Sequence, residues 1–298
     1  LARTDGIFGP TQDTDVRWYE VTARGFQVHR TPLDVSQTLR EFRAASDAAW
    51  IHTSATLAVD GGFDHFAAQM GIKAPITLLE PSPFDYHNQA LMYLPQQLPE
   101  PNTPAHVEAV IEAILPLLDA SGGRAFLLFT SHRALRLAAE QLAERREFSL
   151  FVQGTAPRHL LLENFRNSHN GVLLGAASFW EGVDVAGEAL QLVVIDKLPF
   201  AAPDDPVLEA RLDAIRQTGG NPFRDWQLPS AVIALKQGAG RLIRTHADRG
   251  VLVLCDPRLV SRSYGRIFLD SLPPFARTRE LERALGFLRQ CRLEAQLS

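Results

Sequence analysis

The sequence predicts an α/β domain built on a doubly wound parallel sheet, and two observations lead there. The expected strands are continuous apolar runs, such as Ala125-Phe126-Leu127-Leu128-Phe129, which is typical of strands covered on both faces. Helical patterns separate most of these runs, as parallel strands require. The chain of 298 residues is 46% hydrophobic and 21% charged, which excludes a disordered or collagen-like protein.

The N-terminal part of the chain has a different pattern. Residues 16–21 and 26–29 flank a short turn and predict a β-hairpin. The polar stretch 34–45 predicts a helix, and residues 49–53 predict a short buried strand. Seven prolines lie between Lys73 and Pro104 and exclude a long helix there. We therefore expect a linker with one or two short strands, and a domain boundary within it.

Helices and strands alternate from residue 103 onward. Thr103-Pro104 predicts the start of a helix, and Ser121-Gly122-Gly123 predicts its end. A second helix is expected over residues 132–145. Further strands are expected at residues 148–152, 171–175, 190–196 and 250–256. Because such sheets bind ligands at the carboxyl ends of their strands, polar clusters that follow the strands are the candidates for function.

Charge and cysteine content narrow the class of protein. Thirty Lys and Arg against 34 Asp and Glu give a net charge of −4, which excludes an overall basic field for nucleic acid. Residues 236–266 nevertheless hold seven Lys or Arg and two Asp, so a local basic surface or a solvated charged face is expected there. Two cysteines indicate a reducing compartment. Without a signal peptide or a long apolar stretch we expect a cytoplasmic protein, and the start at Leu1 favours the tail of a longer chain.

The strongest motif is Gln237-Gly238-Ala239-Gly240-Arg241-Leu242-Ile243-Arg244. On a helix, Gln237, Arg241 and Arg244 share one face. An amide with two guanidinium groups suits a phosphate chain, and the two glycines imply a close approach to the backbone. The alternative is a surface helix with ordinary ion pairs, whose glycines serve close packing on the sheet.

A second motif, residues 175–184, follows an expected strand and contains Phe179-Trp180-Glu181-Gly182-Val183-Asp184. Phe179 and Trp180 can stack on bases. Gly182 lets backbone amides approach a ligand, and Asp184 can accept hydrogen bonds from a sugar or a basic side chain. The alternative, favoured for Trp180, is that the rings belong to the core.

Two clusters of small hydroxyl residues also follow strands, Ser54-Ala55-Thr56 and Thr130-Ser131. Both can bind phosphate through hydroxyl and amide groups, and each is also an ordinary helix cap. No His-x-x-x-His or Cys-x-x-Cys spacing occurs, so no metal site is expected. Cys255 is expected to be a core residue.

Taken in order, these motifs and Asp196-Lys197-Leu198-Pro199-Phe200 resemble the back half of superfamily 2 helicases. The strings 179–184 and 196–200 resemble the XPD/DinG family of iron–sulphur DNA helicases, and within it the bacterial YoaA branch. No Gly is followed by Lys, so the phosphate loop of that family is missing, as are its Asp-Glu-x-His box and four cluster cysteines. The resemblance therefore implies that residues 1–75 are a remnant of the first RecA-like domain, and 76–298 the second, with a helical tail.

The resemblance also implies an ATP-driven helicase of DNA repair or replication that acts on single-stranded or forked DNA. ATP and Mg²⁺ would be held mainly by the missing first domain, and a 4Fe-4S cluster is expected only in the missing part. This chain alone would then be inactive. A catalytically silent module that binds a replication protein is the alternative, and an unrelated phosphotransfer enzyme is disfavoured because no nucleophile or phosphate loop is present.

The resemblance implies the following roles. Arg241 and Arg244 would be arginine fingers, and Gln237 would orient the water or the γ-phosphate. Nucleotide contacts are expected from Gly182, Asp184 and Gly240. Hydrolysis would be coupled to domain closure by Ser54 and Thr56. DNA contacts are expected from Thr130, Ser131, Arg133, Phe179 and Trp180.

The C-terminal tail offers a partner site. Leu281, Leu285 and Leu288 form an apolar stripe that predicts a helix packed on the sheet. The stretch 275–278 before it is expected to be harder to bury, so Arg277 and Thr278 are expected to dock a partner. In the YoaA branch, the resemblance implies that this partner is the chi subunit of the clamp loader of the replicative polymerase.

Overall fold

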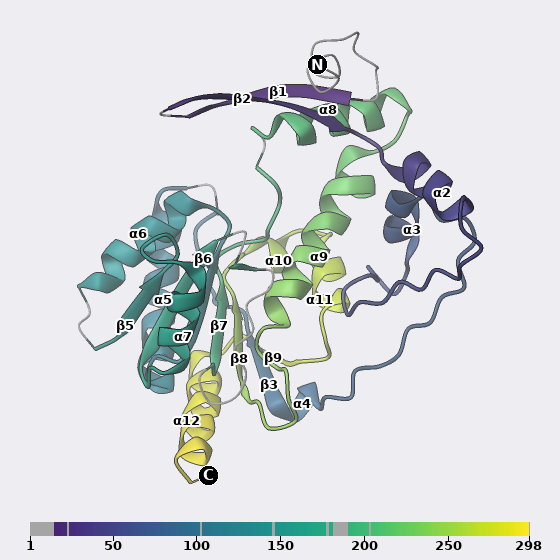
Figure 1. Cartoon of the computed structure of the whole chain (residues 1–298). Helices are drawn as coiled ribbons and strands as arrows, with labels where there is room; N and C mark the ends of the chain where they lie inside the picture. Colours follow the sequence, from purple (N-terminus) through teal and green to yellow (C-terminus); the bar gives the residue numbers. More distant parts are fainter. Residues whose placement is uncertain are drawn as a thin grey trace. The chain divides into compact units, whose positions relative to one another are not determined.

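The structure, a computed structural model, describes residues 15–22, 24–101, 103–144, 147–176, 179–180, 190–202 and 204–297, with the backbone alone at 295–297 (Figure 1). The chain separates into two compact units. The first consists of Leu1–Leu79 and Phe200–Ile233, and the second consists of Glu80–Pro199 and Ala234–Ser298. Each unit is described by itself, and the predicted division between residues 75 and 76 stays a prediction.

The second unit is built on a parallel sheet of seven strands. Their spatial order is β5-β6-β4-β7-β8-β3-β9. The bounds of these strands are β3 (Ala90–Tyr93), β4 (Ala125–Phe129), β5 (Ser149–Val152), β6 (Gly171–Ala176), β7 (Leu192–Ile195), β8 (Gly250–Leu254) and β9 (Ala276–Thr278). Leu127 in the middle of β4 pairs with Leu174 on one side and Val194 on the other. The predicted parallel α/β sheet is confirmed.

Helices cover both faces of this sheet (Figure 1). Their bounds are α4 (Tyr86–Gln89), α5 (Ala105–Ser121), α6 (His132–Ala143), α7 (Arg158–Arg166), α9 (Leu228–Ala239), α10 (Arg258–Ser261), α11 (Gly265–Ser271) and α12 (Leu281–Leu297). On one face, α5 packs between α6 and α12. On the other, Phe165 of α7 contacts Gly171, and Gly238 near the end of α9 contacts Ile195. None of the described helices combines the length and apolarity needed to cross a bilayer.

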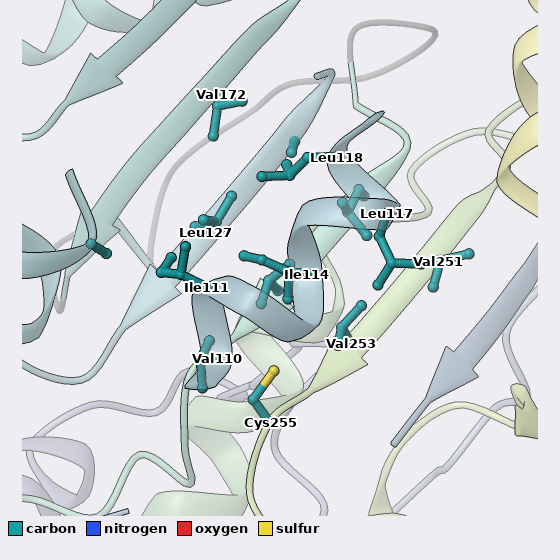
Figure 2. Close-up of a cluster of buried hydrophobic side chains, with 14 of the residues drawn as sticks. Val110, Ile111, Ile114, Leu117, Leu118, Leu127, Val172, Val251, Val253 and Cys255 are labelled. Atoms are coloured by element: carbon teal, nitrogen blue, oxygen red, sulfur yellow. The ribbon is translucent and has the colours of Figure 1, made fainter. Parts of the chain in front are cut away.

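The core explains the continuous apolar runs. Figure 2 shows α5 lying across the strands, with Val110, Ile114 and Leu117 directed into the cluster that contains Leu127. All residues of β4 and β6 are buried, because helices cover both of their faces. Each buried aliphatic side chain contributes about 1.5 to 3 kcal/mol relative to exposure. Cys255 lies in the same cluster and is buried, as expected.

The first unit has little core of its own. The predicted hairpin is confirmed as β1 (Asp15–Thr22) and β2 (Gly25–Pro32), which pair antiparallel. The predicted polar helix is α2 (Ser36–Ala44), which has no buried residue. The unit also contains α3 (Asp64–Met70), α8 (Pro206–Gln217), the π-helix η3 (Phe223–Gln227) and the start of α9.

The predicted buried strand at residues 49–53 is wrong. These residues form no strand, and Ile51 is 84% exposed. Trp50 instead meets the edge of Phe42, with ring centroids 5.6 Å apart. An apolar run forms a strand only when a neighbouring strand takes its backbone hydrogen bonds, and no described segment does so here. The predicted linker, in contrast, contributes one strand, because β3 lies within residues 73–104.

Candidate functional site

Polar side chains follow three neighbouring strands of the second unit. Thr130 comes after β4, Asp196 after β7 and Asp256 after β8, and these strands are adjacent in the sheet. Because parallel strands end at the same edge, all three residues lie at the edge where such sheets bind ligands. This edge is the candidate functional site.

Asp196 ties the ends of β4 and β7 together. Its Oδ1 accepts hydrogen bonds from the backbone N–H of Thr130 (3.0 Å) and of Lys197 (2.8 Å), and its Oδ2 accepts one from the Thr130 hydroxyl (3.4 Å). The carbonyl oxygen of Asp196 lies 2.9 Å from Nε2 of His106, whose Nδ1 lies 3.1 Å from the carbonyl oxygen of Pro99. His106 is a buried anchor that the sequence reasoning missed.

Burial dominates the charge state of Asp196. The pKa of Asp196 is raised to about 7, and desolvation is the largest cause. The charge of Lys197 and the backbone hydrogen bonds lower this pKa, whereas the charge of Asp256 raises it. Asp256 is itself buried and forms a 2.7 Å ion pair with Arg258. Its Oδ2 also accepts a 2.7 Å hydrogen bond from the N–H of Leu198. The stretch that follows β7 is therefore fastened to β8.

Arg241 and Arg244 of the motif at residues 237–244 lie on a loop, so the prediction that a helix carries the whole motif is wrong. Helix α9 ends at Ala239, so Arg241 and Arg244 do not continue the face of Gln237. The N–H of Arg241 bonds to the carbonyl of Gly238 at 3.1 Å, in a tight turn. Glycine near a helix end favours such termination. We call residues 240–249 the arginine loop.

Two buried residues fix the arginine loop. The Oδ2 of Asp248 accepts hydrogen bonds from the N–H groups of Arg244 and Thr245, both at 2.7 Å, and its Oδ1 accepts one from the Thr245 hydroxyl at 2.9 Å. The Nε2 of Gln89 lies 3.0 Å from the carbonyl oxygens of Thr245, His246 and Asp248. Sequence reasoning missed both. An Asp four residues after the second arginine was the available signal, since Asp side chains commonly bond nearby backbone amides.

Trp180 joins the two main motifs, in what we call the Trp180 junction. Its indole Nε1 donates a 3.2 Å hydrogen bond to the carbonyl of Phe129 at the end of β4. Its own carbonyl accepts a 3.0 Å hydrogen bond from Nε of Arg241. A Cβ on Gly238 would lie 3.0 Å from the indole ring. Trp180 and Ile195 therefore make the close approach predicted at this glycine. This agrees with the alternative that the glycine serves packing on the sheet.

Comparison with known proteins identifies the family. A family model described as the helicase C-terminal domain matches residues 114–275. The chain belongs to this family. It is 48% identical over 271 residues to the ATP-dependent DNA helicase YoaA of Escherichia coli (strain K12), covering 91% of this chain and 43% of that protein. It is 37% identical over 263 residues to the ATP-dependent helicase DinG of Mycobacterium tuberculosis (strain ATCC 25177 / H37Ra). This match covers 87% of this chain and 40% of that protein.

Solved structures agree on the fold. XPD helicase matches with a TM-score of 0.65 at 15% identity, over 90% of this chain and 48% of that chain. The resemblance to the C-terminal part of an XPD/DinG-type helicase is confirmed, and so is the RecA-like fold. The chain spans about two fifths of the length of the curated relatives it matches. The share is 43% for YoaA of E. coli and 42% for YoaA of Haemophilus influenzae.

Phe179 and Trp180 belong to the core of this helicase domain, which corrects their prediction as base-stacking residues. They are 3% and 4% exposed. Phe179 lies against Gly175, where a Cβ would be 2.5 Å away, and the Arg158 guanidinium lies 5.2 Å from the Phe179 ring centroid. Base stacking needs an exposed ring face. Both rings instead close the carboxyl end of the sheet.

The hydroxyl residues of the helicase domain are tied up locally. Ser131 is the N-cap of α6 and accepts a 3.2 Å hydrogen bond from the N–H of Ala134. This agrees with the alternative that the residue is a helix cap. Thr130 is bound to Asp196. Arg133, on the first turn of α6, is exposed and makes no hydrogen bond or ion pair with the residues that the structure describes. It presents its charge to solvent.

The remaining predicted helicase residues are distributed as follows. Gly182 and Asp184 lie outside the described residues. Gly240 is exposed in the arginine loop, and Gln237 is half-buried on the last turn of α9. Ser54 and Thr56 belong to the first unit, where their hydroxyl oxygens lie 3.2 Å apart.

No three His, Cys, Asp or Glu side chains gather into a metal-binding set within the described ranges. Both cysteines are buried. Burial raises the pKa of Cys255 well above its usual value and that of Cys291 to about 11. Since thiolates are the metal-binding form of cysteine, neither side chain is poised as a ligand.

The tail of the domain packs on the sheet. Leu285 and Leu288 of α12 are buried, which confirms the packing predicted for the apolar stripe. The expectation that residues 275–278 are hard to bury is wrong, because Phe275 and Thr278 are 5% and 7% exposed. The stretch adds β9 beside β3, and burial follows from that pairing. Arg277 is exposed and donates a 2.6 Å hydrogen bond to the carbonyl of Leu269.

Replacing Asp248 tests how the arginine loop is held. Asp248→Ala removes the acceptor of two N–H groups and one hydroxyl, so the free energy of unfolding should fall by about 2 to 3 kcal/mol. Urea denaturation measures this, and hydrogen exchange should show faster exchange at residues 240–249. Asp270→Ala, which removes an exposed partner of Arg266, should change stability by less than about 0.5 kcal/mol. Equal effects of the two variants would contradict the assignment.

The raised pKa of Asp196 predicts a pH-dependent stability. The folded state keeps the proton up to about pH 7, whereas the unfolded chain loses it near its ordinary pKa. Stability contributed by this group is therefore complete below the unfolded pKa and is lost as the pH rises to the folded one. Asp196→Asn, which keeps hydrogen-bonding atoms at both positions, should gain on the order of 2 kcal/mol relative to wild type between about pH 5 and pH 8. Urea denaturation of both proteins at about pH 5 and about pH 8 measures the difference in their free energies of unfolding. A difference that is the same at both pH values would refute the raised pKa of Asp196.

Proposed function

We propose that this chain is the C-terminal motor portion of an ATP-dependent DNA helicase that acts in DNA repair or replication. Membership of the helicase C-terminal domain family supports this, as do relatives named ATP-dependent DNA helicases. The observation that carries the proposal is the Trp180 junction. It links the arginine loop to the end of β4 through one buried residue, whose carbonyl accepts the Arg241 bond and whose indole bonds to Phe129.

In this proposal, Arg241 and Arg244 supply positive charge to the phosphates of an ATP that the N-terminal part of the full-length helicase holds. Arginine fingers in GTPases raise the rate by about 10³ to 10⁵. Such a role requires a fixed loop, because arginines that are already in position before the reaction need no reorganisation during it. Asp248, Gln89 and Trp180 provide that fixation.

The other nucleotide roles follow from the same motifs. Gln237 would orient the water or the γ-phosphate, and Gly240 would let the nucleotide approach the backbone of the exposed turn. Contacts from Gly182 and Asp184 complete this part of the proposal. Ser54 and Thr56 would couple hydrolysis to domain closure.

DNA contacts are proposed at the start of α6. Arg133 is exposed there, and arginine commonly binds phosphate in the DNA backbone. Thr130 and Ser131 lie beside it and would add backbone contacts. The buried rings of Phe179 and Trp180 are not included.

Mg²⁺ and an iron–sulphur cluster would be held outside this chain. A 4Fe-4S cluster takes four cysteine ligands, whereas the sequence has two cysteines, both buried. The phosphate loop and the Asp-Glu-x-His box are also missing from the sequence. We therefore propose that the chain requires the N-terminal half to hydrolyse ATP.

The ATPase role is tested in a chimera in which this chain replaces the matching C-terminal part of E. coli YoaA. DNA-stimulated ATP hydrolysis should be present in the chimera and absent in the chain alone. Arg241→Ala should lower kcat by at least about 10³-fold while nucleotide binding stays measurable. Arg266→Ala removes the same charge from a side chain that is 88% exposed, and it should leave kcat unchanged. Wild-type turnover by the Arg241 variant would refute the finger role.

The tail supports a second candidate function, a docking site for the chi subunit of the clamp loader. The specific observation is that β9 is the last strand of the sheet and that Arg277 is exposed on it. An edge strand presents backbone groups to which a partner can pair. Thr278 would position Arg277 for the partner, since its side chain is buried and its carbonyl accepts a 3.0 Å hydrogen bond from the N–H of Leu94, beside β3.

Titration of chi tests this docking site. The affinity of chi for the chain should fall by roughly tenfold in Arg277→Ala, because the guanidinium no longer reaches the partner. Arg266→Ala serves as the matched control. Unchanged chi affinity in the Arg277 variant would reject this site and leave the motor proposal untouched.

A further inference from the structure

Helices α5 and α12 of the second unit form a groove of about 700 Å³. Helix α5 lines it with Pro116, Asp119 and Ala120, and α12 lines it with Arg289, Arg292 and Leu293. A groove of this size is within the range of ligand sites, about 300 to 1,000 Å³. The motor chemistry proposed above uses none of these residues.

The groove carries two arginines whose donors meet no acceptor in the described part of the chain. Arg289 and Arg292 are exposed and lie three residues apart, so they share one side of α12. Neither forms an ion pair or hydrogen bond with a described residue. Elsewhere on the same helix, Glu294 pairs with Arg249. The groove therefore presents two guanidinium groups that form no ion pair with a described carboxylate.

Arg292 lies beside the C-terminal end of α5. Its guanidinium carbon would be 3.2 Å from a Cβ on Gly122, the left-handed residue that ends α5. The last turn of a helix carries partial negative charge and attracts a cation. The helix end thus favours the guanidinium at the groove, while its N–H groups can bind a ligand.

The groove also exposes an apolar side chain. Leu293 is 61% exposed, more than any other large hydrophobic side chain described in the second unit. A single exposed leucine needs no explanation, but this one lines the same groove as Pro116 and the two arginines. The combination suits a ligand that is both acidic and apolar.

We propose that this groove binds an acidic segment of a partner protein, in which carboxylates flank a leucine or aromatic side chain. Arginine guanidiniums bind carboxylates in a two-pronged geometry, and Leu293 and Pro116 contact the apolar side chain. The apolar lining by Leu293 and Pro116 disfavours a run of DNA phosphates, which has no apolar group to place there. The site is separate from β9 and goes beyond the proposed motor function.

A labelled peptide of ten residues tests the proposal with the full chain. The probe contains aspartate and glutamate with leucine and phenylalanine between them, and its binding is followed by fluorescence anisotropy. Binding should saturate and weaken as salt is raised. Matched peptides with asparagine and glutamine for the acids, or serine for the apolar residues, should bind at least roughly tenfold more weakly.

Variants of exposed residues locate the binding. Arg289→Glu with Arg292→Glu should weaken the probe by more than roughly tenfold, and Leu293→Ser should weaken it severalfold. Arg283→Glu is the control, because it lies two and a half turns from Arg292 on the opposite face of α12 and should bind like wild type. Circular dichroism confirms that each variant is folded.

Four outcomes would overturn the proposal. They are the absence of saturable binding, equal binding of the neutral peptide, and unchanged affinity in the double arginine variant. The fourth is that the double variant loses single-stranded DNA binding or self-association while the acidic peptide fails to compete, which would assign the groove to nucleic acid or to a second copy of the chain. None of these outcomes bears on ATP hydrolysis by the chimera, so the two proposals fail independently.

Discussion

The contact of the Trp180 indole with Gly238 is the constraint on which the site depends. The ring occupies the space where any larger residue on α9 would place its Cβ. Its Nε1 bonds to the end of β4, and its carbonyl receives Arg241. Because protein interiors are close-packed, these three contacts cannot shift independently. A displacement of Trp180 therefore acts on Arg241 directly.

Three buried carboxylates complete this scaffold, with Asp196 and Asp256 at the carboxyl edge of the sheet and Asp248 just before the amino end of β8. Asp196, Asp248 and Asp256 each accept backbone N–H groups from a loop that follows a strand or helix. Burying a charge is unfavourable unless hydrogen bonds or an opposite charge compensate. Asp256 has Arg258, whereas Asp196 responds with a pKa of about 7. The loops are thus fixed by local polar networks, and one of these is sensitive to pH near neutrality.

The sheet could be predicted because its cause is local in the sequence. A run such as β4 is apolar at every position, and only a strand covered on both faces needs that. The end of α9 is harder to predict, since Gln237, Arg241 and Arg244 have helical spacing and the two glycines between them are interpreted as sites of close approach. The loop is held by Gln89, which is 159 positions from Asp248 in the sequence. The burial of Trp180 likewise depends on Phe129 and Gly238, which only the fold brings together.

The loop geometry changes how the two arginines can act on a nucleotide. On a continuous helix they would form one rigid face and would serve the same phosphates equivalently. In the structure, Arg241 bonds through Nε to the Trp180 carbonyl, whereas the backbone of Arg244 bonds to Asp248. A phosphate that draws on Arg241 thus competes with a contact that reaches β4, while Arg244 is fixed through its main chain. In the proposed motor, Arg241 is therefore the residue through which nucleotide binding would reach the sheet, and Arg244 supplies charge from a fixed backbone.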